Sequence, residues 1–295
     1  MLVSRIEHPS VVRMAEALAR EGVRVIWIDP EPSGVVLGES FARAAEAARA
    51  NDSLDIKLLV LQAVNHETGV IQPVGEVAAV AKTLGALLHV DVVQAVGKLP
   101  PTTWAGADIV SVAAHKIRGP KGIGALCTRP GLKVRPILFG GAQERGLRPG
   151  TQDPVSCAGF AVAANRARES GPARYAALRS MRDRLEAALA ELGGLRNSER
   201  REVGDVGGAR APHVANLSWP GWRGDELCAA LDLEGLAVSS GSACSAGTAE
   251  PSPVITAILG AERASSAVRL SLGENTTESD IDHAIEAFQR VIRRR

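Results

Sequence analysis

The residue types best suited to covalent chemistry lie between Ser111 and Leu126, where an apolar run ends in His115-Lys116 and continues as Ile-Arg-Gly-Pro-Lys-Gly. The pattern predicts a strand, an exposed amine, a tight turn and a second strand. A lysine at the end of a buried strand has a partly desolvated ammonium, which suits a nucleophile that forms a Schiff base with a carbonyl compound. The same stretch also fits an ordinary basic surface turn.

Other polar side chains also follow predicted strands. Asn65-His66 come after the predicted strand 56–64, Asp91 ends the predicted strand 87–91, and Gln94 lies just beyond it. In a parallel sheet, ligands bind outside the carboxyl ends of the strands, so these side chains and Lys116 are expected to converge. An aspartate at a strand end also serves as a helix cap or a turn residue, and that alternative stays open for Asp91.

Pyridoxal phosphate would give each of these side chains a role. Lys116 would hold the cofactor covalently, and Asp91 would keep the pyridine nitrogen protonated so that the ring acts as an electron sink. Gln94 and His115 would donate hydrogen bonds to ring or phosphate oxygens.

Two further residues have chemical potential nearer the C-terminus. Cys244 lies in Ser-Gly-Ser-Ala-Cys-Ser-Ala-Gly, where small neighbours leave the thiol accessible and a flexible loop could carry it to a bound substrate. An inert cysteine in a polar loop is the alternative. Arg269 is the one charged residue of the predicted strand 268–272 and could grip a substrate carboxylate, although an edge-strand arginine facing water is equally ordinary.

The elements that must position these residues alternate between helix and strand. A mainly parallel sheet with helices on both faces is therefore predicted for residues 1–170, the large domain. The predicted helices and strands are 11–21, 23–28, 39–50, 56–64, 74–84 and 87–91.

A smaller α+β domain is predicted for residues 171–295. Two helices, 154–169 and 173–192, are expected to be separated by a break at Gly171-Pro172, which marks the domain boundary. The later elements are predicted as strands at 214–219, 236–239 and 268–272, helices at 225–233 and 251–259, and a last helix capped by Thr276 or Thr277.

Composition excludes several classes of protein. The 295 residues include 34 basic and 33 acidic side chains, so no nucleic-acid or membrane-surface partner is indicated. No apolar run approaches the roughly 20 residues of a membrane span, and the start has no signal-peptide layout, so a cytoplasmic protein is expected. The four cysteines contain no Cys-x-x-Cys pair, which argues against a disulfide framework and against a metal site.

Together these stretches resemble the cysteine desulfurases, pyridoxal-phosphate enzymes of the class V aminotransferase group. The resemblance covers nearly the whole chain and preserves the order of the family's motifs. The motifs are Glu7-His8, Asn65-x-Glu-Thr-Gly-x-x-Gln-Pro73, His89-Val-Asp-x-x-Gln-Ala-x-Gly-Lys98, His115-Lys-x-x-Gly-Pro-Lys-Gly-x-Gly-Ala125, Gln143-Glu-Arg-Gly-Leu-Arg-x-Gly-Thr151, Ser239-Ser-Gly-Ser-Ala-Cys-Ser245, Glu250-Pro-Ser252 and Val268-Arg-x-Ser-Leu-Gly273.

The resemblance implies a large domain like that of aspartate aminotransferase and a role for each matching residue. Lys116 would be the covalent anchor of the cofactor and Cys244 the persulfide-forming cysteine. His8 would stack on the pyridine ring and assist proton transfers. Arg269 would take the substrate carboxylate, and Thr151 would reach the phosphate of the other subunit in a homodimer.

The sequence departs from the family's pattern around the cofactor. It starts after the family's Gly-Ala-Thr-Glu-like phosphate-binding turn. The family's paired asparagines are Asn65-His66 here, so Asn65 is expected at the substrate and the imidazole of His66 near the ring hydroxyl. Ala113 replaces a phosphate-binding serine. Each lost charge-assisted hydrogen bond is worth about 1.5–3 kcal/mol, so weaker cofactor binding is expected.

The implied activity is removal of sulfur from L-cysteine, giving L-alanine and a persulfide on Cys244. The persulfide would pass to an acceptor such as an iron–sulfur scaffold, a sulfur-carrier protein or a tRNA-thiolation enzyme. Two alternatives remain: a catalytically impaired homologue that acts as a binding partner, and a pyridoxal-phosphate enzyme with a different reaction, transamination or elimination.

Overall fold

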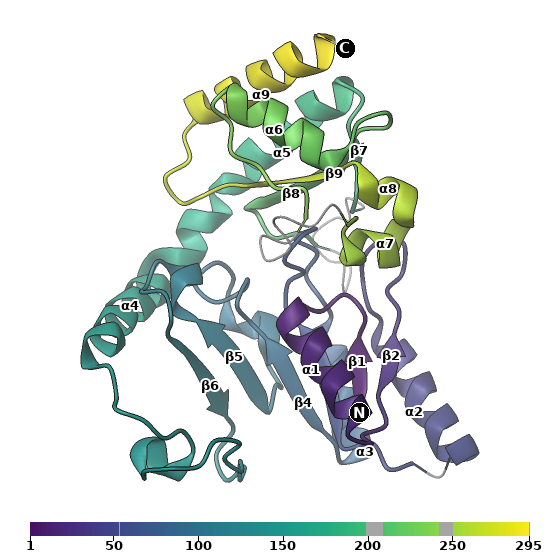
Figure 1. Cartoon of the computed structure of the whole chain (residues 1–295), viewed down its shortest axis with the longest axis vertical. Coiled ribbons are helices and arrows are strands. Elements are labelled where there is room, and N and C mark those ends of the chain that lie inside the picture. Colours follow the sequence, from purple (N-terminus) through teal and green to yellow (C-terminus); the bar gives the residue numbers. More distant parts are fainter. Residues whose placement is uncertain (53, 199–208, 242–249, 295) are drawn as a thin grey trace.

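A six-stranded sheet organises the first part of the chain (Figure 1). The computed structural model describes residues 1–52, 54–198, 209–241 and 250–294. The strand order is β2-β1-β3-β4-β5-β6, and all pairs are parallel except β5 with β6. This confirms the mainly parallel sheet. The strands are β1 (Leu2–Ser4), β2 (Ile26–Ile28), β3 (Leu58–Gln62), β4 (Leu87–Asp91), β5 (Ile109–Ala113) and β6 (Gly124–Thr128).

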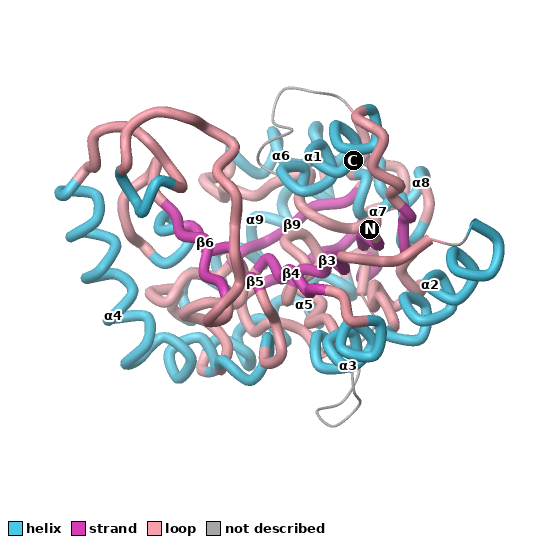
Figure 2. Tube along the Cα trace, turned by 90° about the horizontal axis from the view of Figure 1, so that it is seen from below, coloured by secondary structure: helices cyan, strands magenta, loops and turns pink. Residues whose placement is uncertain are grey.

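Helices cover both faces of this sheet because buried apolar side chains alternate along its strands. Val3 and Val60 face α1 (Pro9–Arg20), whereas Leu2 and Leu59 face the core that includes side chains of α2 (Gly38–Asp52) and α3 (Val74–Leu84). Figure 2 shows α1 and α3 on opposite sides of the strands.

Strand β1 was not predicted by the sequence pattern, and β2 begins three residues later than expected. Both strands are only three residues long, which is too short for a two-residue alternation to stand out. β1 nevertheless lies between β2 and β3, and its three residues are buried.

The second sheet is antiparallel and has the order β7-β8-β9. Its strands are β7 (Leu195–Arg196), β8 (Val214–Ser218) and β9 (Ala267–Ser271), and it shares a core with α5 (Leu178–Glu191), α6 (Gly224–Leu233) and α9 (Glu278–Arg293). Thr277, one of the two residues predicted to cap the last helix, caps α9 through a reciprocal capping box with Asp280. The remaining helices of this region are α7 (Pro253–Leu259) and α8 (Ala261–Ser265).

The predicted strand 236–239 is wrong. Within 236–239 the structure has one isolated bridge, between Ser239 and Arg269. Leu236 and Val238 pack against the second core, so their apolar character reflects burial of side chains rather than pairing in a ladder.

The predicted helix break at Gly171-Pro172 is also wrong, because α4 (Pro154–Ala176) runs through it. Gly171 is there for close packing: a Cβ at this position would lie 2.2 Å from the carbonyl oxygen of Gly97. Ala177, which has helical backbone angles, joins α4 directly to α5, and Leu178 is the first buried residue of the second core. The domain boundary at residues 170/171 stays a prediction, and α4 crosses it.

No helix in the part of the chain that the structure describes has the length and apolar character required to cross a membrane.

A buried ion pair provides a test of how the two sheets are held together. Arg210 (6% exposed) and Glu186 (1% exposed) are paired, and Arg210 also bridges Val70 beside the large sheet. Arg210→Met leaves the buried Glu186 carboxylate with the more distant Arg196, 3.7 Å away. We therefore expect it to lower the free energy of unfolding by up to about 3–5 kcal/mol, the cost of a buried charge that loses its partner. Urea unfolding monitored by tryptophan fluorescence measures the loss.

The double variant Arg210→Met/Glu186→Leu is the control. It removes both charges and is expected to recover most of the lost stability. A double variant no more stable than Arg210→Met alone would contradict this account.

Candidate functional site

The candidate side chains come from loops at the carboxyl ends of four neighbouring strands. Glu7-His8 follow β1, Asn65-His66 follow β3, Asp91 ends β4, and Lys116 follows β5. Since β1, β3, β4 and β5 are parallel neighbours, these ends share one edge of the sheet. The sequence predicted this for the ends of β3, β4 and β5, but not for β1.

His8 is placed by the start of α1. It is the N-cap residue, Pro9 occupies the first turn, and His8 Nδ1 accepts a hydrogen bond from the Ser10 N–H at 3.2 Å. Burial lowers the pKa of His8; the nearby Asp91 carboxylate opposes this effect, and the Lys116 charge lowers the pKa further. His8 is therefore electrostatically coupled to both the carboxylate and the amine.

His66 meets His8 edge to face, with 5.1 Å between the ring centroids. Its Nδ1 lies 3.3 Å from Gln62 Oε1, and the Gln62 amide nitrogen donates to the Ile6 carbonyl, so Gln62 Oε1 is an acceptor. The proton of neutral His66 is accordingly assigned to Nδ1, which leaves Nε2 as an acceptor without a hydrogen bond among the described residues. Glu67 Oε1 lies 3.6 Å from Nε2, and burial raises the pKa of Glu67. Burial, followed by the charges of His8, Arg269 and Lys116, lowers the pKa of His66 to about 3.

Two carboxyl groups, those of Asp91 and Glu7, lie at this edge of the sheet. Asp91 accepts a hydrogen bond from the Val93 N–H at 2.9 Å, and burial raises its pKa. Glu7 accepts the Gln62 N–H at 2.7 Å, and burial together with the Asp91 charge raises its pKa to about 8. Sequence reasoning missed the buried Glu7 carboxyl as a site group; its only signal was its position directly before His8.

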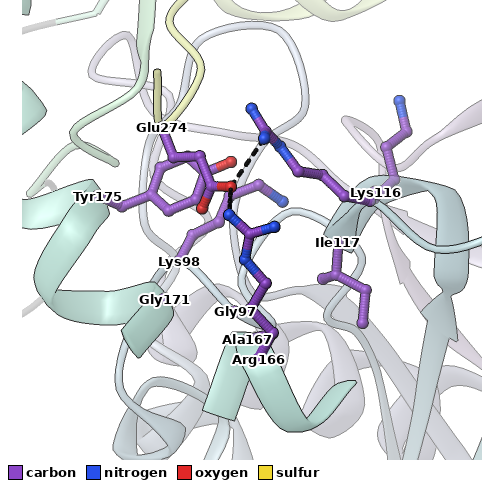
Figure 3. Close-up of a pocket in the computed structure, with 10 residues that line it drawn as sticks. Gly97, Lys98, Lys116, Ile117, Arg166, Ala167, Gly171, Tyr175 and Glu274 are labelled. Carbon is purple, nitrogen blue, oxygen red and sulfur yellow. Dashed lines mark hydrogen bonds and ion pairs between the residues drawn. The ribbon is translucent and has the colours of Figure 1, made fainter. Parts of the chain in front are cut away.

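Lys116 and His115 lie in η2 (Ala114–Ile117), a turn of 3-10 helix directly after β5. Arg118 ends it with φ 66°, and the Gly119 N–H returns to the Ala114 carbonyl at 2.8 Å. The predicted strand, amine, turn and strand are confirmed, with β6 completing the hairpin. Lys116 is exposed, and Figure 3 shows its side chain directed away from Glu274 and Tyr175.

Asn65 is fully buried and is used in the protein's own structure. Its Oδ1 accepts from the backbone N–H groups of Glu67 and Thr68, and its Nδ2 donates to the Ile6 carbonyl at 3.1 Å. The predicted contact with substrate stays a prediction; these bonds give Asn65 a separate role in shaping the loop.

Arg269 reaches across from the small sheet to the same loop. Its Nη1 donates to the His66 carbonyl at 3.1 Å, and the residue is only half-buried. The guanidinium therefore lies beside His66 rather than on a water-facing edge, as its predicted substrate role requires.

For three of the predicted site residues, the structure describes no contact with this cluster. Gln94 lies in the turn after β4, and Thr151 lies in the exposed loop before α4. Cys244 falls within 242–249, outside the residues that the structure describes. Their roles stay predictions.

The residues present fit the ring of pyridoxal phosphate. His66 Nε2 makes no hydrogen bond among the described residues, although Glu67 Oε1 lies 3.6 Å away, so it suits a phenolic hydroxyl. The Asp91 carboxylate, whose pKa burial raises, suits a protonated ring nitrogen. The His8 ring offers a flat face, and Lys116 supplies an amine. For the phosphate, His115 is available beside Lys116, whereas Ala113 brings no hydroxyl.

Comparison with known proteins gives consistent matches. The profile of the family described as aminotransferase class-V matches residues 1–284. A cysteine desulfurase of Gluconacetobacter diazotrophicus is 36% identical over 295 residues, which cover 99% of this chain and 71% of that protein. An IscS-like cysteine desulfurase of Mycobacterium tuberculosis is 36% identical over 298 residues, with 100% and 73% covered. A solved NifS-like protein superposes with a TM-score of 0.85 at 28% identity, covering all of this chain and 75% of its own.

The raised pKa of Glu7 predicts a pH dependence of stability. Between its ordinary pKa of 4.5 and the folded value of about 8, the folded chain holds a proton at Glu7 that the unfolded chain has lost. As the pH rises across that window, the contribution of Glu7 to the free energy of unfolding therefore falls by about 1.4 kcal/mol for each pH unit. Glu7→Gln keeps an acceptor for the Gln62 N–H and removes the ionisation.

We expect Glu7→Gln to be more stable than the parent chain at pH 8.5 and to lose this advantage toward pH 5, as measured by urea unfolding. Glu16→Gln, at a partly exposed carboxylate on α1 that pairs with Arg13, is the control and should show no such trend. A constant difference between Glu7→Gln and the parent chain from pH 5 to 8.5 would contradict the assignment.

Proposed function

We propose that this chain, which belongs to the aminotransferase class-V family, is a cysteine desulfurase that removes sulfur from L-cysteine and leaves L-alanine. The observation that carries the proposal is the convergence of His8, His66, Asp91 and Lys116 at one sheet edge, with Arg269 reaching the same loop from the small sheet. The relatives named cysteine desulfurase support this choice of reaction within the family.

The proposed cofactor is pyridoxal 5'-phosphate, which when bound withdraws electrons from the Cα of an amino acid. Lys116 would hold it covalently, Asp91 would pair with its ring nitrogen, and His66 and His115 would contact its oxygen substituents, with Gln94 as a further donor. The buried, neutral His66 would meet the ring as a hydrogen-bond acceptor because its pKa of about 3 keeps it uncharged at pH 7.

The proposed proton handling uses Lys116 and His8. The Lys116 amine would take the proton from the substrate Cα and would later return a proton to the product. His8, whose pKa burial lowers, would assist this proton transfer. Arg269 would hold the substrate carboxylate by charge-assisted hydrogen bonds, and Asn65 would contact the substrate from its loop.

The sulfur step is assigned to Cys244. Its thiolate would attack the sulfur of L-cysteine, so an S–S bond forms as the substrate C–S bond breaks; the electron pair of that bond, with a proton, ends on the substrate Cβ as L-alanine. The persulfide then passes to a sulfur acceptor, proposed to be a protein of iron–sulfur cluster assembly or of thiolation. We place the protein in the cytoplasm, where a reducing environment keeps such thiols free.

A homodimer is proposed on the basis of an exposed apolar surface. Ile137 and Phe139, between β6 and α4, are 85% and 86% exposed, and Val155 and Val162 on α4 are 80% and 70% exposed. Figures 1 and 2 both show β6, the segment 129–153 and α4 along the same side of the molecule. An apolar surface of this kind favours association, and Thr151 within it could then reach the other subunit's phosphate.

Replacement of the amine tests the chemistry. Chain saturated with pyridoxal phosphate should show a visible absorbance that borohydride bleaches, and mass spectrometry should find the reduced cofactor on Lys116. Lys116→Ala should lack this absorbance and should lose alanine formation from L-cysteine by about 1000-fold or more. Lys121→Ala, an exposed lysine five positions further on, is the matched control and should behave like the parent chain.

The outcomes also separate the alternatives. Cys244→Ala should keep the absorbance but abolish persulfide and alanine formation. Absorbance that never appears with cofactor in excess would contradict the proposal and favour a non-catalytic binding partner. Turnover that survives Cys244→Ala would indicate transamination or elimination instead.

The dimer has its own test. Light scattering of the parent chain should give twice the 30.8 kDa mass of the chain, and Ile137→Ser/Phe139→Ser should give the monomer because it removes exposed apolar side chains from the interface. Leu233→Ser, 90% exposed at the end of α6, is the control and should stay dimeric. A monomeric parent chain would rule out the homodimer.

A further inference from the structure

Glu274, in the loop after β9, joins the small sheet to the segment that carries Lys116. Its side chain is only 8% exposed, and its carboxylate makes three ion pairs. The distances are 2.8 Å to Arg118 Nη1, 2.7 Å to Arg166 Nη2 and 3.3 Å to Arg174 Nη1. Figure 3 shows Glu274 and Arg166 in the pocket that these residues line.

Arg118 is the link between this carboxylate and the reactive amine. It is two residues after Lys116 and has φ 66°, a left-handed conformation that is unfavourable for a residue with a side chain. Its backbone N–H closes η2 onto the Ala114 carbonyl. The ion pair with Glu274 holds Arg118, and with it the end of η2, in this conformation.

Helix α4 is packed directly on the same turn. A Cβ at Gly171 would lie 2.2 Å from the Gly97 carbonyl oxygen, and a Cβ at Gly97 would lie 2.8 Å from Ala167 Cβ and 3.2 Å from Ile117 Cγ2. Gly97 belongs to the turn that follows Asp91. Through Arg118 at the end of η2 and through Arg166 and Arg174 on α4, the Glu274 carboxylate joins η2 to α4. Helix α4 in turn packs on the turn after β4.

The other end of the segment that carries Glu274 contacts the opposite side of the site. Arg269, five residues earlier, donates to the His66 carbonyl. The stretch from Arg269 to Glu274 thus spans the site, and it can fix the distance between the proposed carboxylate-binding guanidinium and the proposed covalent anchor.

We propose that Glu274 is a positioning residue, which holds η2 and α4 against the small sheet so that Lys116 and Arg269 keep their mutual placement. This inference rests on the proposed function. Glu274 acts through Arg118, since the Lys116 side chain is directed away from it (Figure 3). Loss of its charge leaves three guanidinium groups facing one another with no common counter-ion among the described residues, which drives them apart.

Lys98 can report this opening. It is 5% exposed and lines the same pocket as Glu274, Arg118 and Arg166. Its ammonium lies 3.4 Å from the Val93 carbonyl oxygen and 5.9 Å from the centre of the Tyr175 ring. When η2 and α4 separate from the Glu274 loop, this amine becomes accessible to reagents.

The experiment compares the acetylation rate of Lys98 with that of exposed Lys121, measured by mass spectrometry after treatment with an N-hydroxysuccinimide ester of acetic acid. Glu274→Gln should raise the Lys98 rate about 10-fold relative to Lys121, because a locally opened state becomes more populated. Glu234→Gln is the matched control: Glu234 is also bound by two arginines, Arg290 and Arg294, but within the small domain. It should leave the ratio unchanged.

Arg118→Gly is a second variant that keeps the backbone favourable, since glycine accepts a positive φ. It removes the ion pair and should also raise Lys98 acetylation. In the enzyme loaded with pyridoxal phosphate, Glu274→Gln and Arg118→Gly should each lower kcat/KM for L-cysteine about 10-fold, and the double variant should be no worse than either one, since both break the same link.

The outcomes distinguish this inference from the proposed function. If the parent chain shows no cofactor absorbance, the proposed function fails, yet the Lys98 ratio still decides whether Glu274 holds η2. If the absorbance is normal and Glu274→Gln leaves the Lys98 ratio at the parent value, or Glu234→Gln raises it equally, the positioning role is overturned while the proposed function stands.

Discussion

The structure depends on the buried loop 65–69, which lies between the two sheets and makes hydrogen bonds to residues on both sides, Ile6 and Asn216. The Glu67 carbonyl accepts from Asn216 Nδ2 of β8 at 3.0 Å, and the Glu67 carboxylate accepts from Ser252 Oγ at 2.5 Å. Gly69, with φ 73°, lets the loop approach the small sheet: a Cβ there would lie 2.9 Å from Val214 Cβ. Because unpaired buried polar groups are costly, these contacts fix how the sheets meet.

The electrostatics of the site follow from the same burial. Glu7 and Asp91 have raised pKa values and His66 has a lowered one, in each case with desolvation as the leading cause. Burial therefore favours the neutral forms of these three groups, and the site also contains the exposed side chain of Lys116 and the half-buried side chain of Arg269. Such an environment favours a ligand that brings its own charge and its own hydrogen-bonding groups, because each contact then forms away from water.

The loop and the site are coupled through strand β9 and the turn that follows it. Strand β9 places Arg269 against the loop carbonyl of His66, and the turn after it places Glu274 against Arg118 and α4. The proposed covalent anchor and the proposed substrate-binding group come from different sheets. Their geometry therefore depends on contacts between regions distant in sequence, such as that of His66 with Arg269, which lie 203 positions apart.

The sequence by itself determined the alternation of helices and strands, the parallel sheet and the placement of Asn65, Asp91 and Lys116 after strands, because these depend on local periodicity and on the shared edge of parallel strands. The order of its motifs also indicated the family. Only the tertiary structure decided that β1 lies inside the sheet and that α4 continues past Pro172. It also decided that the Asn65 side chain makes hydrogen bonds within its own loop and that Glu274 pairs with three arginines. Each of these depends on partners distant in sequence, whose approach local propensity does not encode.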